Sequence, residues 1–124
     1  MPTIYADTSD GVIRKTGQST YNNAREATSG SVTDNAGSST FVEASYYPSR
    51  RGGVTYNVSR SFYAFDISSI SACSAVTLNI HGKTDASSDD GIIVVRSTAF
   101  GGDGATALAS GDFDAIHGLS LIHI

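Results

Sequence analysis

The sequence is poor in the residues that build helices and disulfides. Its 124 residues include one cysteine, two glutamates and two lysines, but 19 serines, 12 threonines, 13 glycines and ten aspartates. Glutamate and lysine favour helices, whereas serine, threonine, glycine and aspartate favour strands, turns and caps. The composition therefore favours an all-β protein with many turns. Because Cys73 is alone, it cannot form an internal disulfide, and we interpret it as a small buried hydrophobe.

Basic charge and long apolar runs are also scarce. The net charge is -4, and 16% of the residues are charged, against roughly a quarter in typical domains, so we expect no nucleic-acid partner. No stretch approaches the run of about 20 apolar residues that a membrane helix needs, so we expect no membrane insertion. Residues 1–5 do not have the basic region and apolar stretch of a signal peptide. We expect synthesis in a reducing cytoplasm.

Alternation of apolar and polar residues predicts several short strands. The clearest is residues 54–58, where Val54, Tyr56 and Val58 should face a core. From Arg60 the pattern becomes apolar on both faces, as in a central strand. The other predicted strands are 3–6 paired with 12–15 as a hairpin, 40–47 ended by Pro48, 75–81, 92–95 and 105–109. A tight turn or one helical turn is predicted at 66–70, and a capped single helical turn at 110–116.

These strands predict a two-layer antiparallel β-sandwich in one domain of residues 1–118, with no helix longer than about three turns. The predicted core buries at least two of residues 92–95 together with Phe62, Phe65, Leu78 and Ile80.

The last six residues, 119–124, match a translation of the transposase end sequence that is ligated to DNA fragments for short-read sequencing. We interpret them as adapter read-through and exclude them from fold reasoning. On this interpretation the chain is the front of a longer protein and lacks its final strands, which leaves an open sheet edge. The alternative is a short apolar C-terminal strand in a complete small protein.

The segment Arg60–Ile70, followed by Ala75–Ile80, resembles a recurrent signature of jelly-roll β-sandwich modules of the carbohydrate-binding type. These modules occur in structural proteins of tailed bacteriophages and in secreted bacterial proteins. The segments Tyr5–Gly11 and Ser110–Asp114 are more similar to the phage and metagenomic versions. The resemblance implies an all-β jelly-roll fold. Its motif is structural, so it implies no catalytic residues.

Arg60 lies in a strand that is otherwise set to be buried. A buried guanidinium needs a charged partner or several carbonyl groups. Asp66 is a candidate partner, although it is equally suited to cap the turn that follows it.

Few side chains suggest a site. Neither His81 nor His117 has a serine or cysteine placed beside it as a nucleophile, so we predict no enzyme activity and no catalytic residues. Calcium is a possible cofactor in the loop 85–91, where oxygen ligands cluster on a flexible segment, although a solvated turn explains the same residues. The candidate metal ligands are Asp85, Asp89 and Asp90.

Three tyrosines, Tyr21, Tyr46 and Tyr47, are candidates for stacking on sugar rings, because an aromatic face offers flat apolar area with a polar handle. Packing in the core or filling of the surface is the alternative use of each. One of Tyr46 and Tyr47 must point outward if both lie on a strand.

Three functions follow as expectations. The first is a non-catalytic structural or adhesive module of a phage virion or similar assembly, with other virion subunits or cell-surface polysaccharide as partners. The second is a carbohydrate-binding module of a secreted bacterial protein. The third is an accessory domain of a polysaccharide-degrading enzyme whose catalytic part lies elsewhere. The expected location is a virion or the extracellular space.

Overall fold

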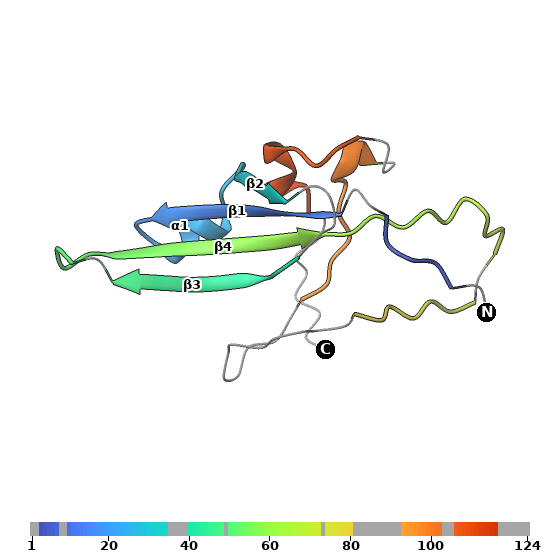
Figure 1. The fold of residues 1–124 in the computed structure, drawn as a ribbon, viewed down its shortest axis with the longest axis horizontal. Helices are drawn as coiled ribbons and strands as arrows, with labels where there is room; N and C mark the ends of the chain where they lie inside the picture. Colours follow the sequence, from blue (N-terminus) through green and yellow to red (C-terminus); the bar gives the residue numbers. More distant parts are fainter. Residues whose placement is uncertain are drawn as a thin grey trace.

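The computed structural model describes residues 3–7, 10–34, 40–48, 50–72, 74–80, 93–102 and 106–116. Within them the chain is mostly strand with short helices, so the prediction of an all-β protein is confirmed (Figure 1). The longest helix in these ranges has five residues. The elements are β1 (Gly11–Gln18), α1 (Tyr21–Arg25), β2 (Ser31–Asp34), β3 (Glu43–Pro48), β4 (Val54–Phe62), and two 3-10 turns, η1 (Phe100–Gly102) and η2 (Ser110–Asp114).

The four strands form one antiparallel sheet in the order β2-β1-β4-β3. The predicted strand at 54–58 is confirmed as part of β4, and the predicted turn at 110–116 contains η2. The strand predicted at 40–47 is confirmed in part, because β3 begins at Glu43 and includes Pro48, the residue predicted to end it. The predicted hairpin of 3–6 with 12–15 is wrong. Residues 12–15 belong to β1, which pairs with β2 and β4, whereas residues 3–6 form no strand.

Alternation along the strands divides the sheet into two faces. The register places Val58 beside Lys15 and Ala44, and Ser59 beside Arg14 and Glu43. Even-numbered residues of β4 therefore share one face with Ile13, and odd-numbered residues share the other with Arg14. We call these the core face and the polar face.

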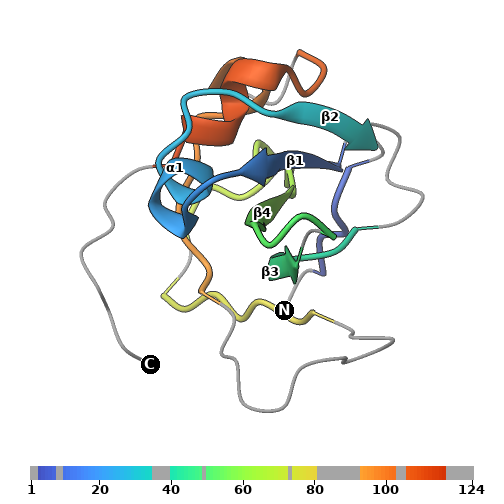
Figure 2. The ribbon, with the colours of Figure 1, turned by 90° about the vertical axis from the view of Figure 1, so that its left-hand side faces the viewer.

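The core face is covered over only part of its width. Its buried cluster joins Ile13, Val58 and Phe62 of the sheet to Ala24 of α1 and to four residues that follow in the chain, Ala99, Phe100, Leu108 and Phe113. Figure 2 looks along the strands and shows α1 on one side of the sheet, with η1 and η2 near β1 and β2. β3 lies at the opposite edge, so the part of the core face nearest to it is left open.

Close contact between β2 and β1 depends on Gly30. A Cβ at this position would lie 2.7 Å from Cγ2 of Ile13 and 2.9 Å from the carbonyl oxygen of Arg14. The Gly30 amide donates to the carbonyl of Ser110, 3.0 Å away, which ties the start of β2 to η2. Any larger residue at position 30 must therefore push β2 away from the core.

The predicted core is wrong in part. Phe62 is buried at 4% exposure, but Phe65 is 40% exposed, and Leu78, Ile80, Ile93 and Val94 are exposed as well. Residues 75–80 and 93–96 form no strand, and neither do 106–109. An alternating pattern shows which side chains could face a core. Those side chains become buried only where a neighbouring strand and an opposing layer are present.

Several predictions fall outside the described residues. They concern the possible metal ligands Asp85, Asp89 and Asp90, the histidines His81 and His117, Cys73, and the segment 119–124.

The burial difference between the two phenylalanines of the signature is testable. Phe62→Ala should lower the free energy of unfolding by about 3–5 kcal/mol, because it leaves a cavity in the buried cluster. Phe65→Ala should cost less than about 1 kcal/mol, because much of that ring is already in water. Urea denaturation of both variants measures the difference. Equal losses of unfolding free energy in the two variants would show that the core is not centred on Phe62.

Candidate functional site

The polar face carries a connected network centred on Glu43. Arg14, Ser59 and Glu43 lie side by side on β1, β4 and β3. Because adjacent strands are about 4.8 Å apart, the long side chains of Arg14 and Glu43 can meet above the small Ser59. The Arg14 guanidinium lies 2.8 Å from one Glu43 oxygen and 3.0 Å from the other. Ser59 donates to the same carboxylate at 3.2 Å and is only 1% exposed.

The network extends along β3 and β4. Ser45 donates to Glu43. The side-chain NH2 group of Asn57 donates to the Ser45 hydroxyl at 3.5 Å, and its side-chain oxygen accepts from the Gly17 backbone amide at 3.0 Å. Burial raises the pKa of Glu43, but hydrogen bonds from Ser45 and the charge of Arg14 outweigh that effect and hold the pKa below its ordinary value of 4.5. Glu43 is therefore an ionised anchor for the sheet and not a proton donor near neutral pH.

This network has little capacity for chemistry. A catalytic serine needs a general base within hydrogen-bond reach and access to substrate. Ser59 is covered, and its carboxylate partner is committed to an arginine. Across the described ranges, no three histidine, cysteine, aspartate or glutamate side chains come together as a metal site.

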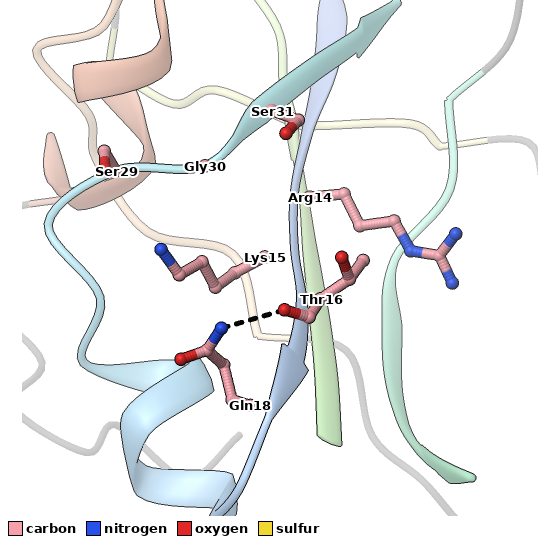
Figure 3. Close-up of a pocket in the computed structure, with 7 residues that line it drawn as sticks. All are labelled: Arg14, Lys15, Thr16, Gln18, Ser29, Gly30 and Ser31. Carbon is pink, nitrogen blue, oxygen red and sulfur yellow. Dashed lines mark hydrogen bonds between the residues drawn. The ribbon is translucent and has the colours of Figure 1, made fainter. Parts of the chain in front are cut away.

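A small polar cavity of about 280 Å³ opens beside the start of β2, where β1 continues past Ser31. Figure 3 shows Lys15 and Gln18 pointing toward α1 and the Ser29–Ser31 segment, while Arg14 points away toward β3. Gln18 donates to the carbonyl of Thr16 at 2.8 Å. That bond satisfies a backbone group that β2 is too short to reach.

Aromatic side chains are gathered on the open part of the core face. Tyr46 of β3 is directly opposite Tyr56 of β4, and Pro48 is opposite Val54. Directly opposed residues have Cβ atoms about 4.5–5.5 Å apart, so the two tyrosines are neighbours on one surface. Tyr46 is 68% exposed, whereas Tyr56 is half-buried against the core cluster. We call Tyr46, Tyr56, Pro48 and Val54 the aromatic platform.

Tyr47 lies on the polar face. It is 53% exposed, and its hydroxyl donates to Glu43 at 3.4 Å. Sequence alternation required one of Tyr46 and Tyr47 to point outward. Both are exposed, because β3 is at the edge of the sheet and the core face is uncovered there.

The second hollow is a cleft of about 570 Å³, within the size range of ligand pockets. It lies beside α1, η2 and the segment that begins at residue 93, on the core face at Arg60. Its lining combines an aromatic ring, two aliphatic side chains, two guanidinium groups and two carboxylates. The lining residues are Tyr21, Arg25, Glu26, Arg60, Ile93, Asp114 and Ile116.

The wall on the α1 side is built by a short capped helix. Thr20 is the N-cap, and its hydroxyl accepts from the Asn23 amide at 3.1 Å. Ala24 turns into the core, which leaves Tyr21 and Arg25 on the exposed side of the helix. Arg25 lies over the Tyr21 ring, 5.9 Å from its centre, and pairs with Glu26 at 2.5 Å. Sequence alternation had not identified this helix, because five residues give no periodic signal.

The floor of the cleft is Arg60. Its guanidinium donates to the Phe113 carbonyl of η2 and, at 2.5 Å, to the Arg25 carbonyl at the end of α1. It also stacks on the Phe113 ring, 4.1 Å from the centre. Of the two partners expected for this arginine, the carbonyl groups are confirmed. Asp66 instead accepts from the Ser68 amide at 2.9 Å and caps the turn.

The predicted ligand-binding tyrosines thus fall in three places. Tyr46 is in the aromatic platform, Tyr47 is on the polar face and Tyr21 is in the cleft, where it is 42% exposed. Sequence reasoning missed Arg25, Glu26 and Asp114 as cleft residues. Their positions depend on packing between segments far apart in the chain, so no local pattern marks them.

Comparisons with protein families, with curated proteins and with solved structures gave no match to this chain. No helix within the described ranges has the length and apolar character needed to cross a membrane.

The ionised state of Glu43 predicts a pH dependence. Its lowered pKa means that it contributes stability above about pH 4.5, and that this contribution is lost as the pH falls through the folded-state pKa. Glu43→Gln should cost about 1–2 kcal/mol at pH 7, a value limited by solvent screening at the sheet surface. The gap between wild type and variant should narrow below pH 4.5 in urea denaturation. A gap independent of pH would contradict the assignment.

The double carbonyl contact of Arg60 predicts that lysine cannot replace it. An ammonium group is a compact charge and cannot reproduce a planar fork that binds two carbonyls and stacks on a ring. Arg60→Lys should lower the free energy of unfolding by about 1–3 kcal/mol. Arg25→Lys is the matched control, and it should cost less because its ion pair is exposed. Comparable losses in the two variants, measured in urea, would contradict the role given to Arg60.

Proposed function

We propose that this chain is a non-catalytic adhesive module of a phage virion or similar assembly, and that it holds polysaccharide on the aromatic platform. The observation that carries the proposal is the exposed Tyr46 beside Tyr56 on the uncovered core face. Carbohydrate rings present flat apolar faces that stack on aromatic side chains, and a polysaccharide repeats such faces along its length. Two adjacent tyrosines on a sheet give a surface that matches this repeat.

The open platform is itself support for a binding role. An apolar strip on a sheet face costs free energy in water unless a partner covers it. Tyr46, Val54 and Pro48 are all exposed on this strip. A partner that is largely hydrated, such as a sugar polymer, suits a surface in which each aromatic ring also carries a hydroxyl group.

A non-catalytic role is supported by the state of the polar network. Its one carboxylate is held by Arg14, and its most central hydroxyl, that of Ser59, is covered. The jelly-roll sandwich implied by the sequence resemblance belongs to the same proposal. The sheet β2-β1-β4-β3 would then be one of its layers.

The two exposed tyrosines of β3 provide a matched test, because they are adjacent in sequence and lie on opposite faces. Binding is measured by pull-down and affinity electrophoresis on bacterial capsular polysaccharides, lipopolysaccharide O-antigens, cellulose and chitin. We expect Tyr46→Ala to weaken the binding seen with wild type by about threefold to tenfold, the size of one aromatic stacking contact. Tyr47→Ala should leave it unchanged.

Circular dichroism and urea denaturation confirm that both variants are folded. Binding that survives Tyr46→Ala, or equal losses in both variants, would remove the platform from the binding surface. Failure of the wild type to bind any of these polysaccharides would contradict the proposed function itself.

A further inference from the structure

We infer that the cleft between α1 and η2 is a second carbohydrate subsite, and that it selects a neutral pyranose unit over an acidic one. This inference rests on the proposed function, because it places part of the same polysaccharide in the cleft. It concerns different residues from the platform, namely Tyr21, Arg25, Glu26, Arg60 and Asp114.

The apolar part of the lining suits the face of a sugar ring. The cleft places the Tyr21 ring among its walls together with the aliphatic side chains of Ile93 and Ile116. Tyr21 is partly exposed, so its ring is available to a ligand. An aromatic face flanked by aliphatic groups binds the C–H surface of a pyranose by the same stacking that we assign to the platform.

The polar part of the lining suits hydroxyl groups. Arg25 and Arg60 are donors only, whereas ionised Glu26 and Asp114 are acceptors only. Each hydroxyl of a sugar donates one hydrogen bond and accepts others, so a lining that supplies both donors and acceptors satisfies both capacities. A ligand with acceptors alone, such as phosphate, could not donate a hydrogen bond to either carboxylate.

The charge balance argues against an acidic sugar. Two guanidinium groups and two carboxylates give the cleft no net charge, and Arg25 is already paired with Glu26 at 2.5 Å. A uronic acid would place a further negative charge close to Glu26 and Asp114. The chain as a whole carries a net charge of -4, which also repels an acidic polymer.

The two guanidinium groups are held in place before any ligand arrives. Arg60 is fixed by the carbonyls of Phe113 and Arg25, and Arg25 is held by Glu26 and the Tyr21 ring. Each guanidinium has five N–H donors, more than these contacts use, so donors remain that could bind a ligand. Pre-ordered side chains bind with a smaller loss of conformational entropy.

The cleft and the platform lie on one face of the sheet. Arg60 and Tyr56 are both core-face residues of β4, four positions apart, which is about 13 Å at about 3.3 Å per residue. Tyr46 is the direct neighbour of Tyr56 on β3. An oligosaccharide of a few rings could therefore occupy both places at once, with one unit in the cleft and others on the platform.

Three matched pairs of small probes test the inference. They are the methyl glycosides of glucose, galactose and mannose, each compared with the methyl glycoside of the corresponding uronic acid. Binding is followed by NMR, using the ring protons of Tyr21 and the Nε–H groups of Arg25 and Arg60. We expect at least one neutral glycoside to shift these signals, and its uronic partner to bind at least about fivefold more weakly, the effect of one added like-charge contact.

Two variants sharpen the test. Tyr21→Ala should weaken the neutral glycoside about threefold to tenfold. Asp114→Asn keeps a hydrogen-bond acceptor but removes the charge, so it should narrow the difference in affinity between the neutral glycoside and its uronic partner. Tyr47→Ala, on the opposite face, is the control and should change nothing.

The outcomes separate this inference from the proposed function. If polysaccharide binding depends on Tyr46 but no glycoside shifts the cleft signals, the cleft is not a subsite and the platform stands. If the cleft signals shift but Tyr46→Ala leaves polysaccharide binding intact, the cleft stands and the platform fails. A uronic glycoside that binds as tightly as its neutral partner would overturn the selection for neutral sugar.

Discussion

The guanidinium of Arg60 is the contact on which the arrangement of the covering layer depends. It is the point where the central strand β4, the end of α1 and the 3-10 turn η2 meet. α1 is one short helix and η2 is a single turn, so neither has enough hydrogen bonds to be stable alone. Both are held by burial of Ala24 and Phe113 and by carbonyl groups that a single planar cation can bind together.

This anchor also explains why the core face is only partly covered. α1 and η2 pack over β1 and the part of β4 that is next to β1, and they do not extend to β3. β3 is held by its pairing with β4 and, on the polar face, by the contact of Glu43 with Arg14 across β4. The sheet is therefore braced by charge on its polar face and by apolar packing on its core face, and the two kinds of contact lie at different places along its width. The aromatic platform is the part of the core face that neither α1 nor η2 covers.

Local sequence predicted the parts of the fold that depend on neighbouring residues. The alternation from Val54 to Val58 located β4, and the demand of a buried guanidinium for carbonyls anticipated the contacts of Arg60. The exposed positions of Tyr46 and Tyr47 follow from the same strand periodicity together with the edge position of β3. For the location of β4 and the alternation of Tyr46 and Tyr47, the residues within about five positions were enough, whereas the partners of Arg60 lie 35 and 53 positions away.

Other parts could not be predicted in this way. The pairing of β1 with β4 joins residues that are 38 to 51 positions apart in the sequence, and the alternating pattern of a strand does not determine which strand it pairs with. Phe65 and Leu78 were assigned to the core because their pattern is apolar, but burial depends on an opposing layer that a pattern does not supply. The cleft is the extreme case, because its lining comes from four separate segments between residues 21 and 116.

The two contacts of Arg60 couple ligand binding in the cleft to the stability of the fold. The same side chain forms the floor of the cleft and holds its two walls together, so the cleft exists only while α1 and η2 remain docked. A molecule that binds this closed form and not the unfolded chain must stabilise the docked state by mass action, by about 2.7 kcal/mol at a concentration of 100 times its dissociation constant. The melting temperature of the protein is therefore a direct readout of occupancy, and a library of unlabelled compounds could be screened by heating alone.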